Sequence, residues 1–113
     1  MVHPRQKMRR SNNRAVKYLL DNGFEAVWVA PHLRFGTYTH FKDRKVKGLD
    51  IFGIADGICV KNGETYYLQI KSNSWGGFKE FQEVCQRLHI KGLFLNVKDR
   101  KGVSVREVTP MTL

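Results

Sequence analysis

The dipeptide Asn62-Gly63 constrains the fold of this chain more than any other feature, because it stands between two stretches rich in β-branched and aromatic residues. Residues 57–61 precede it and residues 64–71 follow it. Asparagine followed by glycine is typical of the type I′ turn, which needs positive φ at both central residues and joins two antiparallel strands. The sequence therefore predicts a β-hairpin with a two-residue turn.

A two-residue turn also determines which residues lie opposite each other in the hairpin. Lys61 then pairs with Glu64, and the same register continued along the strands places Asp56 across from Gln69. Directly opposed side chains lie on one side of a sheet, with Cβ atoms about 4.5 to 5.5 Å apart. The alternation of a strand adds Lys71 to that side. We therefore expect an acid, an amide and an ammonium group to converge at one end of the hairpin.

Patterns on either side of the hairpin predict the remaining elements. Apolar residues recur at helical spacing after Ser11, a plausible cap, and Gly23 follows them as a stop. A second apolar stripe begins after Gly77 and ends near His89. The predicted elements are, in order, a helix over 11–22, strands over 24–30, 57–61 and 64–71, a helix over 78–89, and strands over 93–97 and 103–108. This order, α-β-β-β-α-β-β, predicts one α/β domain.

The length of 113 residues suits a single domain with one core, covering residues 1–113. Residues 1–10 are predicted to form a basic N-terminal arm, whose order or disorder the residues leave open. No apolar run reaches the roughly 18 residues of a membrane span, and nothing resembles a signal peptide, so we expect a cytoplasmic protein. Cys59 and Cys85 stand in apolar stretches and are predicted to be small core residues.

Basic residues give the chain a formal charge of +10, which favours a polyanionic partner such as a nucleic acid. One basic cluster stands at the N-terminus, and a second lies in residues 31–48, which show no clear period and are predicted to form a long loop. The candidate nucleic-acid contacts are Arg9, Arg10, Arg14, Arg34, Lys42, Arg44, Lys45 and Lys47, together with Ser72 and Ser74. The alternative is that the clusters are solvated faces and the serines are ordinary loop residues.

The convergence at the hairpin end matches the chemistry of a metal site. A hard cation such as Mg²⁺ needs oxygen ligands, here the Asp56 carboxylate, the Gln69 side-chain carbonyl and the Ile70 backbone carbonyl. Lys71 could neutralise charge on a phosphodiester. Asp50 is a candidate second carboxylate, with a turn or capping role as its alternative. For the whole group the alternative is a solvated strand face with an Asp–Lys ion pair, and we assign no metal to the histidines.

The segment Asp56-Gly57-Ile58, followed by residues 68–72 with the sequence LQIKS, resembles the signature of the PD-(D/E)XK nuclease superfamily. Among its members the chain is most similar to the archaeal Holliday-junction resolvases, over roughly residues 11–88. The resemblance implies a restriction-endonuclease-like fold, in which helices flank a central mixed β-sheet. It also implies a homodimeric endonuclease of DNA recombination and repair that uses Mg²⁺, or Mn²⁺ in its place, on duplex or branched DNA.

Two residues depart from the pattern of this superfamily. Gln69 stands where the third-strand acid is expected, and Asn12 or Asn13 stands near the place of a first-helix glutamate. Both changes remove negative charge and should weaken the binding of a divalent cation. The missing charge leaves open a non-cleaving or weakly active DNA-binding relative of the same fold. The basic composition leaves open a second alternative, a basic RNA- or ribosome-binding protein.

Overall fold

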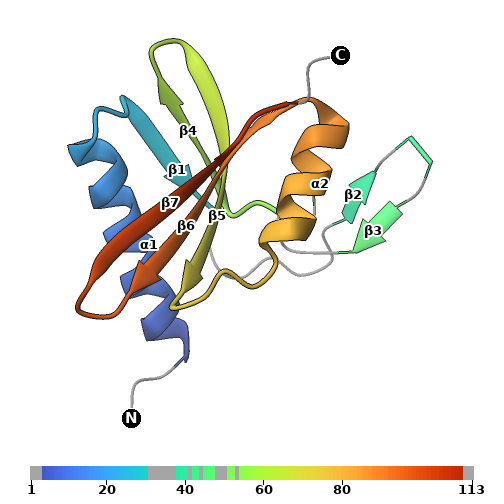
Figure 1. Ribbon diagram of the computed structural model, residues 1–113. Coiled ribbons are helices and arrows are strands. Elements are labelled where there is room, and N and C mark those ends of the chain that lie inside the picture. The colour runs from blue at the N-terminus through green and yellow to red at the C-terminus, as the bar shows by residue number, and fades with distance from the viewer. Residues whose placement is uncertain are drawn as a thin grey trace.

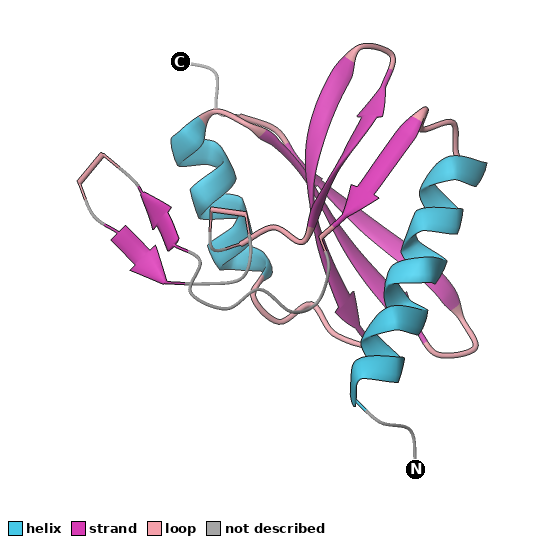
Figure 2. Ribbon diagram, turned by 180° about the vertical axis from the view of Figure 1, so that it is seen from behind, coloured by secondary structure: helices cyan, strands magenta, loops and turns pink. Residues whose placement is uncertain are grey.

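A five-stranded β-sheet with one helix on each face forms the body of the protein (Figures 1 and 2). The computed structural model describes residues 4–30, 38–40, 42–43, 45–47, 51–52 and 54–110. Its elements are α1 (Pro4–Asp21), β1 (Ala26–Val29), β2 (Tyr38–His40), β3 (Lys45–Lys47), β4 (Gly57–Lys61), β5 (Glu64–Ser72), α2 (Phe78–Leu88), β6 (Lys91–Lys98) and β7 (Gly102–Val108). The main sheet has the strand order β1-β4-β5-β6-β7. None of the described helices is long and apolar enough to cross a membrane.

The predicted hairpin is confirmed, with its register, as the pair β4 and β5. Lys61 lies opposite Glu64, and the pairing continues to Gly57 opposite Leu68. Asn62 and Gly63 have φ of 52° and 77°, so both turn residues adopt the left-handed conformation that the type I′ turn needs. This local signal therefore sets the alignment of the two strands on which the candidate site stands.

The sheet is mixed, as expected. Strands β5 and β6 run parallel, with α2 as the crossover between them, whereas the other neighbouring pairs are antiparallel. Parallel neighbours need such a crossover because a tight turn can only reverse the chain. The consequence for function is that the carboxyl ends of β5 and β6 lie next to each other.

The two faces of the sheet hold separate apolar clusters. Leu68 and Ile70 of β5 belong to a buried cluster with Ala15 and Leu19 of α1. On the other face, Phe94 of β6 packs with residues of α2, namely Phe81 and Cys85. Burying one such large apolar side chain stabilises the fold by about 1.5 to 3 kcal/mol. Cys59 and Cys85 are both buried and free, which confirms that they are core residues.

Close packing of α2 on the sheet depends on Gly92 of β6. A Cβ at this position would lie 2.6 Å from ring carbons of Phe81 and 2.8 Å from the sulfur of Cys85. Both neighbours are almost completely buried, so neither could move away easily. The glycine lets the helix approach the strand closely.

The expected start of the first helix was wrong. Helix α1 begins at Pro4, which suits the first turn of a helix because proline has no N–H to lose there. Ser11 is not a cap but a buried residue within the helix, and its hydroxyl bonds to the hydroxyl of Ser72 on β5. Residues 4–10 thus belong to α1.

The long loop predicted for residues 31–48 was wrong in part. Strands β2 and β3 pair there as an antiparallel two-stranded ribbon that is separate from the main sheet. Each has only three residues, too few to show the alternation by which a strand is found in a sequence. The other residues of this segment lie largely outside the part of the chain that the structure describes.

Candidate functional site

Asp56 lies where β4 separates from the hairpin ladder. By the hairpin register, the N–H of Ile70 should meet the main-chain carbonyl of Ala55. Ala55 instead forms a bridge with Ile51, through hydrogen bonds of 2.7 and 2.9 Å between their main chains. The carboxylate of Asp56 takes the vacated position and accepts a hydrogen bond of 2.8 Å from the Ile70 N–H. The acid therefore closes the end of the ladder with its side chain.

The backbone of Ile70 brings a second oxygen to the same edge. In a strand, the N–H and C=O of one residue point to the same side, and the N–H of Ile70 points toward Asp56. The main chain of Asp56 is also held, because its carbonyl accepts a hydrogen bond of 2.8 Å from the N–H of Ala30. A fixed carboxylate and a main-chain carbonyl thus share the edge of β5 beyond the end of β4.

Gln69 and Lys71 lie on the face of the sheet that α2 covers in part. Gln69 is the register partner of Phe94, and Lys71 is the partner of Asn96, both on the parallel neighbour β6. Gln69 is half-buried and Lys71 is exposed. These two side chains share a face, as their spacing predicted. The convergence of Asp56 with them stays a prediction, since the hydrogen bond described for its carboxylate runs to the backbone of Ile70.

The oxygen donors suit a hard cation with few protein ligands. Among the residues that the structure describes, no group of three or more His, Cys, Asp and Glu could hold a metal ion. Asp50, the candidate second carboxylate, lies outside these residues. Asp56, the Gln69 amide oxygen and the Ile70 carbonyl are the donors that stay predicted from the sequence. One carboxylate with neutral oxygens fits Mg²⁺, which commonly keeps several waters and takes one or two carboxylates.

The serines that follow Lys71 have partners within the protein. Ser72 is bonded to Ser11, and the N–H of Ser74 donates to the buried Asn96 side chain at 2.8 Å. The Ser74 hydroxyl oxygen accepts the N–H of Gly76, also at 2.8 Å. These bonds shape the loop between β5 and α2. A role of Ser72 and Ser74 in binding phosphate stays a prediction.

The predicted nucleic-acid contacts fall into three groups. On α1, Arg10 is exposed and Arg14 is half-buried, with Arg9 in the preceding turn; Asn12 is half-buried and Asn13 exposed. On and beside the ribbon, Lys42 and Lys45 are exposed and Lys47 ends β3. Arg34 and Arg44 lie outside the described residues. Among the described residues, Arg14 ties the group on α1 to the strand ends, because it donates a hydrogen bond of 2.9 Å to the Lys98 carbonyl.

The sequence reasoning missed the residues that surround the carboxyl ends of β5 and β6. No local pattern in the sequence assigns a role to Asn73, Asn96 or Asp99. Their positions follow from the parallel pairing of β5 with β6, which no local pattern reveals. The sequence did contain one sign of this pairing, a predicted helix between two apolar strands. A strand–helix–strand unit places the carboxyl ends of both strands at one edge of the sheet, where ligands of α/β proteins bind.

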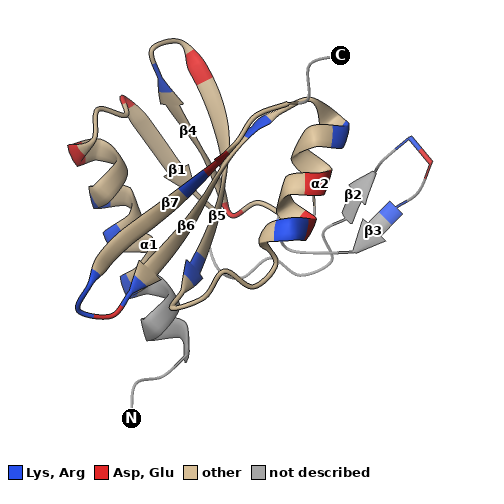
Figure 3. Ribbon diagram, viewed as in Figure 1, with Lys and Arg blue, Asp and Glu red and all other residues tan. Residues whose placement is uncertain are grey.

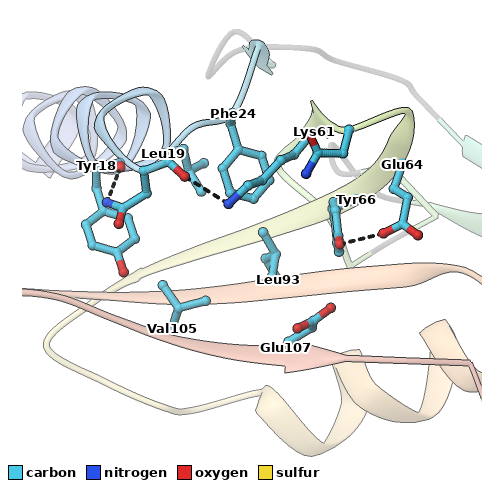
Figure 4. Close-up of a pocket in the computed structure, with 11 residues that line it drawn as sticks. Tyr18, Leu19, Phe24, Lys61, Glu64, Tyr66, Leu93, Val105 and Glu107 are labelled. Atoms are coloured by element: carbon cyan, nitrogen blue, oxygen red, sulfur yellow. Dashed lines mark hydrogen bonds between the residues drawn. The ribbon is translucent and has the colours of Figure 1, made fainter.

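A pocket of about 450 Å³ lies at the other end of β5, between α1 and the hairpin (Figure 4). Two hydrogen bonds join residues that line it: the Tyr66 hydroxyl donates to Glu64 at 2.9 Å, and Lys61 donates to the Asn22 carbonyl at 3.0 Å. The salt bridge from Lys91 and the Tyr66 bond lower the pKa of Glu64, and the same carboxylate raises the pKa of Tyr66 to about 12. This pocket is remote from Asp56 and does not belong to the candidate site.

No family model, curated protein or solved structure matches this chain. A superfamily can therefore be proposed only from the motif, the order of the elements and the hairpin register.

Proposed function

We propose that this protein is a metal-dependent DNA endonuclease with a restriction-endonuclease-like fold, related to the PD-(D/E)XK nucleases. The observation that carries the proposal is the position of Asp56. Its carboxylate lies beside the Ile70 main chain at the carboxyl end of β5, and Lys71 follows on the same strand. The net charge of +10 supports a nucleic-acid substrate, and the resemblance extends this to branched, Holliday-junction-like DNA.

Asp56, Gln69 and the Ile70 carbonyl are the residues that would hold Mg²⁺, or Mn²⁺ in its place. When bound there, the ion supplies a water of lowered pKa and charge stabilisation at the scissile phosphate. The hydrogen bond from Ile70 holds the Asp56 carboxylate in one orientation before any ion arrives. Preorganised ligands of this kind lose little freedom on binding.

Lys71 supplies positive charge next to these oxygens. The side chain is exposed, so its ammonium group can reach a phosphate oxygen on the surface of the sheet. Positive charge aimed at the position where negative charge develops lowers the barrier to phosphodiester cleavage. In this proposal Lys71 binds the scissile phosphate directly.

A DNA-binding relative that does not cut is the second candidate function. One observation favours it: the Asp56 carboxylate already satisfies the Ile70 N–H, a structural role that needs no metal. Gln69 is neutral where an acid is expected, which points the same way. On this second proposal the strand end would have a structural role only, while the basic surface binds DNA.

Cleavage assays on four substrates separate these candidates. Labelled duplex DNA, four-way-junction DNA, single-stranded DNA and RNA are each incubated with Mg²⁺, Mn²⁺ or a chelator. We expect strand cleavage of DNA in either metal and none in the chelator, with junction DNA cut most readily. Binding of DNA without cleavage in any metal would favour the second candidate, and a clear preference for RNA would contradict both.

Two further parts of the proposal concern the state of the protein in the cell. We propose a homodimer, because one chain carries one candidate site and a symmetric junction has two strands to cut. We also propose a reducing, cytoplasmic location. The two cysteines, Cys59 and Cys85, are free, which agrees with a reducing compartment. Light scattering at micromolar concentration tests the dimer.

A further inference from the structure

Basic residues lie at the carboxyl ends of β5 and β6, next to α1 (Figure 3). Lys98 is the last residue of β6, and the exposed Arg100 and Lys101 form the turn to β7. Arg14 of α1 reaches this turn and donates to the Lys98 carbonyl at 2.9 Å. Arg10, four residues earlier on the helix, is exposed. Residues far apart in the sequence thus form one basic surface.

The turn that carries these charges is clamped to the end of β5. The Asn73 amide donates to the Asp99 carboxylate at 3.1 Å, and the Asp99 N–H donates to the Asn73 side-chain oxygen at 2.8 Å. The N–H of Asn73 also donates to the Val97 carbonyl at 2.9 Å. These bonds hold the turn in place and direct the carboxylate of Asp99 toward Asn73. Arg100 and Lys101 are therefore presented from a fixed support.

We propose that Arg10, Arg14, Lys98, Arg100 and Lys101 form a phosphate-binding rim for the backbone of duplex DNA. The inference deepens the proposed function, on which it rests for the identity of the nucleic acid. Guanidinium and ammonium groups on a rigid support bind phosphate oxygens with little loss of freedom. The acidic Glu64 lies at the opposite end of β5, beside the pocket of Figure 4, and so does not oppose this charge.

The position of the rim relative to the candidate site determines where bound DNA lies on the protein. Lys71 precedes Ser72, the last residue of β5, and Ser72 lies beside Val97 of β6, next to Lys98. Asp56 is bonded to Ile70 at that same end of β5. A duplex whose phosphates lie along the rim would therefore cross the end of the sheet at which the candidate site lies. The rim binds the flanking phosphates, whereas the site itself meets a single phosphodiester.

The test compares two double variants that each remove two positive charges. Arg100→Gln/Lys101→Gln removes them from the rim, and Lys61→Gln/Arg87→Gln removes them from the hairpin end of β4 and the last turn of α2. Binding to a labelled duplex is measured by fluorescence anisotropy over a range of salt concentrations. Each lost phosphate contact makes the negative slope of log K against log salt less steep by about 0.9, so the slope of the rim variant should be less steep by about 1.8. The control variant should keep the slope of the parent protein.

Equal slopes for the parent and the rim variant would overturn the rim while leaving the proposed function intact, provided that the parent binds and cuts DNA. Equal flattening in both variants would also overturn it, because the charge would then act without regard to position. A parent protein that binds no duplex DNA contradicts the rim and the proposed function together. Thermal melting of all three proteins shows that the comparison is made between folded chains.

Discussion

The carboxylate of Asp56 accepts a hydrogen bond of 2.8 Å from the N–H of Ile70, at a position where the hairpin register calls for a main-chain carbonyl. The same side chain is the carboxylate of the proposed metal site. Asp56 therefore has a structural role, closing the ladder, and a proposed chemical role. Substitutions that separate the acceptor oxygen from its charge distinguish the two.

The structural role predicts different stabilities for two variants of Asp56. Asp56→Ala leaves the part-buried N–H of Ile70 without its acceptor, which should lower the free energy of unfolding by about 1 to 3 kcal/mol. Asp56→Asn keeps an acceptor oxygen and should lose clearly less. Urea denaturation in the absence of divalent metal measures both. Equal losses would show that the carboxylate contributes through its charge and not as an acceptor.

Gln69→Glu should increase the response of the protein to metal. A second carboxylate in the donor set binds a divalent cation more tightly than a neutral amide does. Without metal, the added charge near Asp56 should make the variant slightly less stable, since like charges repel. Thermal melting of parent and variant, each with and without Mg²⁺, provides the test. If both gain the same stability from the ion, Gln69 is not a ligand.

The clamp between Asn73 and Asp99 leads to a prediction on stability and binding together. Asp99→Ala removes the acceptor of the Asn73 amide and should destabilise the protein by about 0.5 to 1.5 kcal/mol. Asp99→Asn keeps an acceptor, so it should be nearly neutral for stability while removing a negative charge from the rim. DNA should then bind Asp99→Asn more tightly than the parent. Weaker binding by this folded variant would argue against the rim.

The pair of Glu64 and Lys91 predicts how stability responds to acid. Lys91 and Tyr66 lower the pKa of Glu64 below its usual 4.5, so the folded state favours the charged carboxylate. The stabilisation from this pair is present above the unfolded pKa and is lost as pH falls through the lowered folded value. Lys91→Gln should raise the pKa of Glu64, as followed by NMR titration of its carboxyl carbon. An unchanged pKa would show that the 2.7 Å contact is not maintained in solution.

The elements that were predicted correctly carry local signals. Asn62-Gly63 specifies its turn through two positive φ angles, and the two-residue turn then aligns β4 with β5. The apolar stripe of α2 is complete within eleven residues, and its Phe81 and Cys85 are buried as the spacing requires. In both cases the residues that decide the structure are close in sequence.

The features that were missed depend on contacts between distant residues. Serine is a residue type that often caps a helix, but Ser11 lies within α1, which begins at Pro4. Its hydroxyl is hydrogen-bonded to Ser72 of β5. The capping of Ile70 by Asp56 requires β4 to leave the ladder, which follows from the bridge between Ile51 and Ala55. The spacing of apolar residues and the preferences of residue types for helix or strand depend on neighbours along the chain. They contain no information on contacts between residues that are distant in sequence.

Metal-dependent cleavage of a labelled four-way DNA junction by the parent protein and by Asp56→Asn tests the central claim most directly. The variant keeps an acceptor for Ile70, so its fold and its binding of DNA should be preserved, and Arg87→Gln, in the last turn of α2, serves as a surface control. We predict cleavage by the parent and the control in Mg²⁺ or Mn²⁺ but not in chelator, and no cleavage by Asp56→Asn. Cleavage by Asp56→Asn at the rate of the parent would contradict the account. So would the absence of cleavage by all three proteins in both metals.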